Sequence, residues 1–343
     1  PTGAQRRAVA EAGVDLKREC PMSRLIQGDV GSGKTAVAAA LCYTVIKNGY
    51  QCALMAPTEI LAEQHYHSLG SLLQNTGIRL GLLTGSRSAR EKREVLEGLA
   101  GGTIDFVVGT HALVQDKVAF HRLGLVVTDE QHRFGVKQRA ALAQKGENPH
   151  MLVMSATPIP RTLALIIYGD LEVSVLDELP PGRQVIETYA VGSALRERVY
   201  RFLKKHIDAG RQAYIICPLV EEGESDLASA QEYAQKLREG PFKGYTVGLL
   251  HGRLPTAEKE EVMRAFSDGR VQLLVSTTVV EVGVDVPNAV DMVIENAERF
   301  GLSQLHQLRG RVGRGRHQST CVLISNAQNE EARRRLQVMC ETA

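Results

Sequence analysis

Residues 28–35 read GDVGSGKT and stand between a short apolar run at 24–27 and a helical pattern at 34–47. A strand, a glycine-rich loop and a helix in this order are typical of a parallel α/β sheet. The glycines let backbone N–H groups face an anion, and the helix adds the positive end of its dipole. The segment therefore predicts an α/β fold with a phosphate-binding loop. A glycine-rich turn beside a solvated lysine is the alternative interpretation.

Short apolar runs alternate with helical patterns along the rest of the chain, which is the pattern of repeated βαβ units. We expect strands at 52–57, 79–83, 106–109, 125–129, 152–156, 185–189, 213–217, 247–250, 273–276, 292–295 and 321–325, and helices at 60–73, 90–99, 136–144, 194–209, 227–238, 256–266, 304–308 and 329–340. The string DELPPGR at 177–183 interrupts this alternation. The sequence thus predicts two tandem domains, 1–180 and 181–343, each a mostly parallel sheet flanked by helices.

Composition excludes several other classes of protein. No apolar run approaches the roughly 20 residues of a membrane helix, so no membrane span is expected. The 41 basic and 39 acidic side chains give a net charge of +2, so bulk charge does not indicate a nucleic-acid partner. Six cysteines without a C-x-x-C pair predict neither a zinc site nor a disulfide framework and favour a reducing compartment. The start at Pro1, without a secretory signal, is interpreted as that of a piece of a longer protein.

Four residues of the first half carry phosphate chemistry. Lys34 would supply positive charge to the β and γ phosphates, and the Thr35 hydroxyl would ligate Mg²⁺. Asp129 and Glu130 follow an apolar strand, so Asp129 would hold the Mg²⁺ and Glu130 would orient or deprotonate the attacking water. Two solvated carboxylates at a strand end are the alternative. The absence of an N-K-x-D string and the presence of a second α/β half disfavour a GTPase and a small-molecule kinase.

The second half holds five arginines and no acidic residue between positions 299 and 316. Within it, residues 304–315 read QLHQLRGRVGRG. We expect Arg311 and Arg314, three residues apart, to be neighbours on one helical face. They would reach the γ-phosphoryl group as arginine fingers from the opposite lobe, an effect worth about 10³ to 10⁵ in rate. A solvated basic face or a nonspecific phosphate-binding strip is the alternative.

Together these strings resemble a superfamily 2 helicase, and more closely the RecG branch-migration helicases, with the transcription-repair coupling factor translocases as near relatives. The resemblance covers essentially the whole chain and implies two RecA-like P-loop domains. DEQH followed by RFGVKQR, with SATPIPRTL beyond it, separates this group from the RNA helicases that carry DEAD. The strings are GAQRRAV (3–9), GDVGSGKT (28–35), APTEILAEQH (56–65), LLTGS (82–86), VVGTHAL (107–113), DEQHRFGVKQR (129–139), SATPIPRTLAL (155–165), HGRLP (251–255), STTVVEVGVDVPNA (276–289) and QLHQLRGRVGRG (304–315).

The resemblance implies an ATP-dependent DNA helicase with ATP and Mg²⁺ as cofactors, acting on duplex DNA, forks and Holliday junctions in recombination and repair. It implies that Gln5 reads the adenine edge, that Gly283 and Asp285 lie near the nucleotide, and that Gln307 and His132 link the lobes. Ser155 with Thr157 would couple hydrolysis to domain closure. The expected phosphate-binding residues are Gly28, Asp29, Val30, Gly31, Ser32, Gly33, Lys34 and Thr35.

The resemblance also implies that small hydroxyl, glycine and imidazole groups grip the DNA backbone without reading its sequence. These are Pro57, Thr58, Thr84, Gly85, Thr110, His111, His251, Gly252, Thr277 and Thr278. Taken singly, a residue such as Thr58 or Thr110 has a turn or helix cap as its alternative role. Aromatic residues make up 5% of the chain and Trp is absent, so base stacking is not the expected grip.

Full-length RecG proteins carry an OB-type wedge domain before the glutamine motif and a translocation hairpin after the arginine motif, and neither fits within 343 residues. Two other functions stay open: a nucleic-acid-binding module with little turnover, and an RNA helicase. We expect a monomer without membrane contact, located in the cytoplasm of a bacterial-type cell and associated with the nucleoid.

Overall fold

Buried apolar strands form two parallel sheets, one in each of two compact units, Pro1–Pro181 and Gly182–Ala343. The computed structural model describes residues 1–29, 31–129, 136–156, 171–178, 185–218, 225–277 and 284–341. Every strand pairing in this part of the chain is parallel. None of the helices described there is long and apolar enough to span a bilayer.

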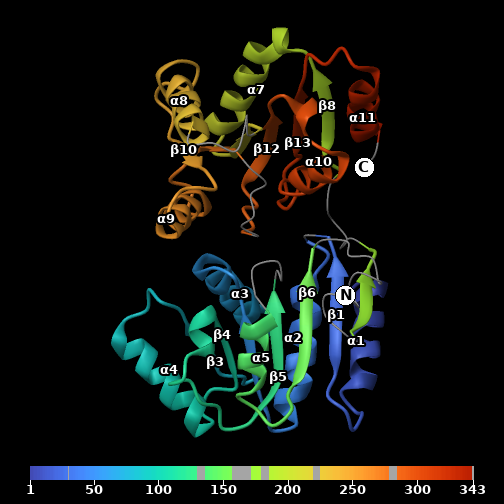
Figure 1. Cartoon of the computed structure of the whole chain (residues 1–343), viewed down its shortest axis with the longest axis vertical. Coiled ribbons are helices and arrows are strands. Elements are labelled where there is room, and N and C mark those ends of the chain that lie inside the picture. The colour runs from blue at the N-terminus through green and yellow to red at the C-terminus, as the bar shows by residue number, and fades with distance from the viewer. Residues whose placement is uncertain are drawn as a thin grey trace. The chain divides into compact units, whose positions relative to one another are not determined.

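The first unit contains a seven-stranded sheet in the order β3-β4-β2-β5-β6-β1-β7, flanked by helices (Figure 1). Its strands are β1 (Ser23–Gly28), β2 (Gln51–Met55), β3 (Leu80–Leu83), β4 (Phe106–Gly109), β5 (Leu123–Asp129), β6 (His150–Ser155) and β7 (Glu172–Leu176). Its helices are α1 (Gly3–Asp15), α2 (Lys34–Lys47), α3 (Glu59–Leu72), α4 (Ala89–Gly101) and α5 (Val136–Ala143).

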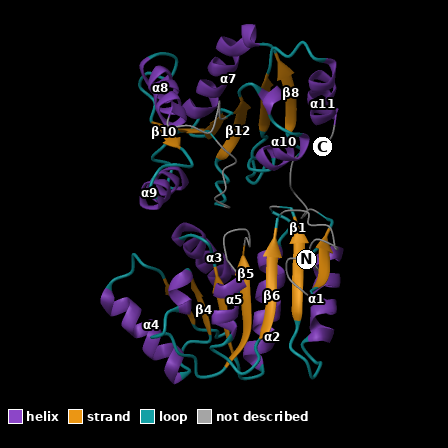
Figure 2. Ribbon diagram, viewed as in Figure 1, coloured by secondary structure: helices purple, strands orange, loops and turns teal. Residues whose placement is uncertain are grey.

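The second unit contains a six-stranded sheet in the order β10-β11-β9-β12-β13-β8 (Figure 2). Its strands are β8 (Glu187–Val191), β9 (Gln212–Ile216), β10 (Val247–Leu250), β11 (Leu273–Ser276), β12 (Ala289–Ile294) and β13 (Thr320–Ile324). Its helices are α7 (Arg196–Asp208), α8 (Ser225–Glu239), α9 (Thr256–Ser267), α10 (Leu302–Arg309) and α11 (Glu330–Glu341).

Burial explains why the central segments form strands. All residues of β2, β5 and β9 are buried, as expected for strands covered on both faces of a parallel sheet. Separate apolar clusters fill the two units: one includes Leu99, Leu113 and Val126, and the other includes Leu203 and Leu273. The predicted fold class, two α/β domains with parallel sheets, is confirmed.

Two elements were not predicted from the sequence. α1 is rich in Ala, Gly and Arg and has no clear apolar stripe, and its start is fixed by a capping box between Thr2 and Gln5. β7 lies at the sheet edge, and its exposure alternates instead of staying low along the strand. Continuous apolar runs predict central strands, and edge strands lack this pattern.

Candidate active site

The loop predicted to bind phosphate connects β1 to α2, which is the position expected from the sequence. Gly33 is the N-cap of α2 in the left-handed region with φ +86°, and no side chain caps the first N–H groups of the helix. Among the described residues, the Ser32 hydroxyl is buried without a hydrogen-bond partner. Uncapped helix N–H groups and an orphaned buried hydroxyl are suited to phosphate oxygens. The loop therefore fits the polyphosphate of a nucleotide.

Lys34 lies over the carbonyl groups of its own loop. Its Nζ donates hydrogen bonds to the Gly28 carbonyl at 2.6 Å and to the Asp29 carbonyl at 3.0 Å. Thr35 follows in the first turn of α2 and is half-buried. The ammonium group and the Thr35 hydroxyl thus stand at the same helix N-terminus, where an anion and its metal ion would be held.

Gln5 contacts this loop from α1. Its Oε1 accepts a hydrogen bond from the Thr2 backbone N–H at 2.9 Å, and its Nε2 donates to the Ser32 carbonyl at 3.0 Å. A Cβ at Gly33 would lie only 2.0 Å from Gln5 Nε2. The side chain predicted to read adenine therefore also fixes the backbone of the phosphate loop.

The carboxyl ends of β1, β6 and β5 lie next to one another in the sheet. Gln27 of β1 is in register with Ser155 of β6, and Met154 of β6 is in register with Asp129 of β5. This register brings the predicted metal ligand Asp129 and the predicted coupling residue Ser155 to the same sheet edge as the phosphate loop. Ligands of open α/β sheets bind at this edge.

Asp129 is held by a residue to which the sequence reasoning gave no role. His65 Nε2 lies 2.5 Å from Asp129 Oδ2, and both side chains are about nine-tenths buried. His65 belongs to α3 and lies four residues from the buried Leu61 and from the buried Leu69. This spacing, one polar residue on the buried face of a helix, is the signal in the sequence that could have identified it.

Mg²⁺ keeps several waters and takes oxygens from phosphates, so it needs only one or two protein ligands. Within the described ranges, no group of three or more His, Cys, Asp or Glu side chains is arranged to hold a metal ion. Thr35 and Asp129 carry oxygen ligands at the same sheet edge, of the type that Mg²⁺ takes.

Six predicted residues lie outside the described ranges: Val30, Glu130, His132, Thr157, Thr278 and Gly283.

The arginine motif of the second unit differs from the prediction in one respect. α10 ends at Arg309, and Gly313 has φ +79°, so Arg311 and Arg314 are not neighbours on a helical face. The prediction of a shared helical face is therefore wrong. Gly310 and Gly313 end the helical pattern because glycine is poor in helix interiors.

The side chain of Arg314 is 4% exposed, and its Nη1 donates to Asp285 Oδ1 at 3.0 Å. A Cβ at Gly315 would lie 2.3 Å from the Pro287 carbonyl, so only glycine permits this approach of the arginine motif to the segment around Asp285. Arg311 is also buried, whereas Gln307 on α10 is exposed. Arg309 has a structural role, because its guanidinium is buried and donates to the Met339 carbonyl.

The predicted DNA contacts divide into two groups by burial. Gly85, His111 and Gly252 are exposed and Pro57 is half-buried. Thr58, Thr84, Thr110, His251 and Thr277 are buried. Thr58 is the N-cap of α3 and accepts a hydrogen bond from the Leu61 N–H at 3.3 Å. The exposed group is therefore the better candidate for direct contact with a phosphate, and the buried group for shaping these loops.

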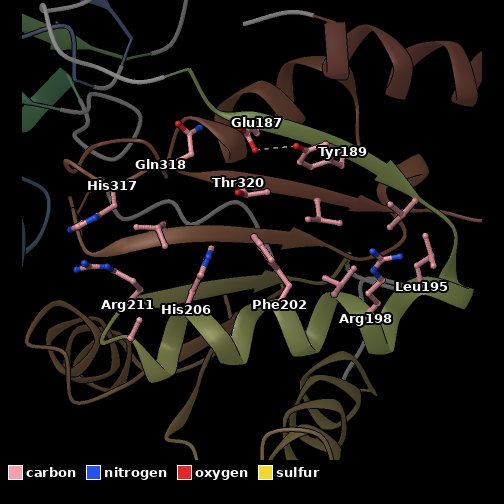
Figure 3. A pocket seen from close by; sticks show the side chains of 15 residues that line it. Glu187, Tyr189, Leu195, Arg198, Phe202, His206, Arg211, His317, Gln318 and Thr320 are labelled. Atoms are coloured by element: carbon pink, nitrogen blue, oxygen red, sulfur yellow. Dashed lines mark hydrogen bonds between the residues drawn. The ribbon is translucent and has the colours of Figure 1, made fainter.

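A separate cavity of about 730 Å³ lies in the second unit between α7 and the strands β8, β12 and β13 (Figure 3). Its lining is mostly apolar and includes the side chains of Arg198, Arg211 and His317. His206 in its wall has Nδ1 2.6 Å from the buried Asp291 Oδ2, and burial raises the pKa of Asp291 to about 6. None of the predicted site residues lines this cavity, so it is distinct from the candidate active site.

Burial also perturbs the groups around Glu295, which follows β12. Arg196 of α7 donates hydrogen bonds to both carboxylate oxygens of Glu295, at 3.0 and 2.9 Å. We assign this pair a structural role, because it fixes α7 to the sheet. Burial raises the pKa of Tyr200 to about 12 and the pKa of the Cys217 thiol to about 12. These groups are therefore protonated near neutral pH and act as packed, hydrogen-bonding parts of the core.

Comparison with known proteins adds a family to this geometry. Residues 2–166 match the DEAD/DEAH box helicase family, and residues 195–316 match the helicase conserved C-terminal domain. The chain is 56% identical to the ATP-dependent DNA helicase RecG of Synechocystis over 98% of its length, and 55% identical to that of Bacillus subtilis over 99%. It spans 41% and 50% of the length of these relatives.

Solved structures agree with this family. A structure of RecG bound to a three-way DNA junction matches 99% of the chain and 44% of that protein, with a TM-score of 0.87 and 47% identity. A structure of Dbp5 of S. cerevisiae bound to RNA and ADP BeF3 matches 99% of the chain and 87% of that protein, with a TM-score of 0.65 and 19% identity. The second likeness concerns the fold alone.

Proposed function

Because the chain belongs to the RecG-type superfamily 2 helicases, we propose that it is the ATP-driven motor of a DNA translocase that acts on duplex and branched DNA. The observation that carries this proposal is the common sheet edge of the phosphate loop, Asp129 and Ser155 in a chain 47% identical to a junction-bound RecG. In this proposal residues 1–180 are the ATP-binding domain and 181–343 the helicase C-terminal domain.

The residues of the first unit would bind the nucleotide. Gln5 reads adenine while its amide holds the Ser32 carbonyl, and the α2 N-terminus with Lys34 binds the phosphates. Thr35 and Asp129 would hold Mg²⁺, which when bound neutralises charge that develops on the phosphate oxygens. Glu130 orients the attacking water, and Ser155 couples hydrolysis to motion.

The residues of the second unit would supply positive charge. Arg311 and Arg314 act on the γ-phosphoryl group, and Asp285 keeps Arg314 in place until phosphate oxygens compete for its guanidinium. Gln307 is exposed on α10 and belongs to the same motif. Placing charged donors before the reaction lowers the barrier without further reorganisation.

DNA is the proposed partner. The sugar-phosphate backbone of the DNA would contact Pro57, Gly85, His111 and Gly252 directly, since these are the exposed or half-buried members of the predicted set. Forks and Holliday junctions are the proposed substrates of the longer protein, supported by the relatives' printed function and by the junction-bound structure. We further propose a monomer located in the cytoplasm beside nucleoid DNA, since the relatives are bacterial.

The proposal is tested by measuring ATP hydrolysis without nucleic acid, with linear duplex DNA, with a model fork and with duplex RNA. We expect turnover stimulated by DNA and lost in Lys34→Ala, and a loss on the order of 10³-fold or more in Arg311→Ala with nucleotide binding retained. Lys47→Ala at the exposed end of α2 and Arg334→Ala on α11 are the matched controls and should keep wild-type turnover.

Three results would contradict the proposal. Full DNA-stimulated turnover in Arg311→Ala would remove the arginine motif from catalysis. Equal stimulation by RNA and DNA would favour an RNA helicase. Nucleotide binding and DNA binding without any phosphate release would leave a binding module with little turnover.

A further inference from the structure

The hydrogen bond between His65 and Asp129 joins two segments that are 64 residues apart. Asp129 ends the buried strand β5, and His65 lies on α3. Their side chains are 10% and 11% exposed, so solvent competes little for the bond. A carboxylate that binds a metal is commonly held by hydrogen bonds from neighbours, which fix its orientation and tune its affinity. His65 stands in this relation to the proposed Mg²⁺ ligand.

The backbone of α3 places the ring of His65 with little freedom. Its neighbours at four-residue spacing, Leu61 and Leu69, are 2% and 0% exposed and belong to the same buried face. His65 as a whole residue, backbone included, is 9% exposed. A ring packed in this way presents one nitrogen to Asp129 Oδ2 and leaves the other carboxylate oxygen of Asp129 to a second partner.

The N-terminal end of α3 adjoins two of the three proposed DNA-binding segments of the first unit. Thr58 caps the helix directly after the half-buried Pro57. Glu59 in its first turn accepts a hydrogen bond from the Ser86 N–H at 3.0 Å, next to the exposed Gly85. The seven residue steps from Thr58 to His65 rise about 10 Å along the helix. One continuous helix therefore connects the proposed DNA contacts to the proposed metal ligand.

We propose that His65 is a positioning residue that couples DNA at the first turn of α3 to the Asp129 carboxylate. This inference rests on the proposed function. Helices shift as units by an ångström or two when a ligand binds. A shift of α3 on DNA binding moves the hydrogen-bond donor of Asp129, and with it the oxygen available to Mg²⁺. His65 touches neither DNA nor nucleotide in this scheme and acts through Asp129.

The test compares four variants of the full 343-residue chain. His65→Gln retains an N–H donor near the position of Nε2, His65→Asn carries the same amide on a side chain one methylene shorter, and His65→Leu removes the donor. His67→Leu is the control, because His67 is exposed on the same helix. Two quantities are measured: the Mg²⁺ concentration for half-maximal binding of a fluorescent ADP analogue, and the ratio of ATP turnover with and without linear duplex DNA.

We expect His65→Leu and His65→Asn to raise the Mg²⁺ requirement on the order of 10 to 100-fold and to reduce the DNA stimulation ratio. His65→Gln should restore both quantities most of the way, and His67→Leu should match wild type. Urea unfolding verifies that each variant is folded. If His65→Leu does not fold, the comparison of His65→Asn with His65→Gln tests the positioning role, since both variants carry a polar amide.

Two outcomes overturn the inference. If folded His65→Leu and His65→Asn keep the wild-type Mg²⁺ requirement, His65 is a core residue without a positioning role. If the Mg²⁺ requirement rises while the DNA stimulation ratio stays at the wild-type value, the coupling to DNA is refuted. Absence of turnover in the wild-type chain refutes the proposed function instead, and the Mg²⁺ titration of ADP binding still tests the bond between His65 and Asp129.

Discussion

At Gly33 the backbone conformation and the available space both disfavour a side chain. Its φ is +86°, and an added Cβ would lie 2.0 Å from the Gln5 amide nitrogen. Gly77 has φ +77° but nothing within 4 Å of an added Cβ. Comparing the same substitution at the two glycines therefore separates the cost of backbone strain from the cost of displacing Gln5.

We predict that Gly77→Ala lowers the free energy of unfolding by about 1 to 2 kcal/mol, because a left-handed conformation is unfavourable for alanine. Gly33→Ala should cost this amount and on the order of 1 to 3 kcal/mol more, because Gln5 must give up its hydrogen bonds to Thr2 and Ser32. Urea unfolding of both variants gives the difference, and equal losses would mean that Gln5 moves aside without cost.

At the scale of secondary structure elements, a buried guanidinium fastens three of them together. Arg24 of β1 donates to Asp15 at the end of α1 at 2.7 Å and to Ser174 of β7 at 2.8 Å. Asp15 is 3% exposed, so the cost of burying its carboxylate must be offset by its partners. Arg18 also lies 3.0 Å from Asp15, but its side chain is 53% exposed.

We predict that Arg24→Met destabilises the first unit by about 3 to 5 kcal/mol, because it leaves Asp15 buried and poorly paired. Arg18→Met should cost no more than about 1 kcal/mol, because the Arg18 side chain is half exposed and Asp15 keeps its buried partner Arg24. Chemical unfolding followed by circular dichroism measures both. A cost for Arg24→Met as small as that for Arg18→Met would show that Asp15 is stabilised by other groups.

The contact of α7 with β12 predicts a dependence of stability on pH. Burial raises the pKa of Asp291 to about 6, above the value of about 4 in an unfolded chain. Between these values the folded protein holds a proton that the unfolded chain has lost. The contribution of Asp291 to the free energy of unfolding therefore falls as pH rises from about 4 to about 6, by at most about 3 kcal/mol.

Urea unfolding at several pH values between 4 and 7 checks this expectation. The wild-type curve should lose stability relative to Asp291→Asn across that interval, whereas Asp268→Asn, an exposed carboxyl in the same unit, should run parallel to wild type. Parallel curves for wild type and Asp291→Asn would mean that Asp291 is ionised in the folded protein throughout, paired with His206.

At the scale of the whole molecule, each unit has its own apolar core. Leu99 is fully buried in the cluster of the first unit, and Leu273 is fully buried in the cluster of the second. Each cluster consists of residues from one unit only. A cavity made in one core therefore weakens the packing of that unit.

We predict that Leu99→Ala and Leu273→Ala each cost about 2 to 5 kcal/mol, and that each affects a different part of the calorimetric unfolding curve. An ADP analogue should stabilise the part that Leu99→Ala affects, because the phosphate loop belongs to the first unit. A single transition shifted equally by both substitutions would show that the two units unfold together.

Features that depend on one short stretch of sequence could be predicted, and features that depend on how distant elements pack could not. The place of the glycine-rich loop between β1 and α2 could be predicted, because GDVGSGKT holds its glycines, lysine and hydroxyl in one string between a strand and a helix. The bond from His65 to Asp129 could not, because it depends on how α3 packs beside β5. The shared helical face of Arg311 and Arg314 was predicted from their spacing alone, and Gly310 and Gly313 end the helix before that spacing applies.

The position of β1 within its sheet determines when the sheet of the first unit can be completed during synthesis. β1 lies between β6 and the edge strand β7: Arg24 pairs with Leu152 on one side and with Glu172 on the other. Such high contact order slows folding, since distant residues must meet. The loop at 28–35 leaves the ribosome early, yet its supporting strand gains both partners only after residue 176 has emerged. A nascent chain should therefore acquire its affinity for nucleotide late and abruptly.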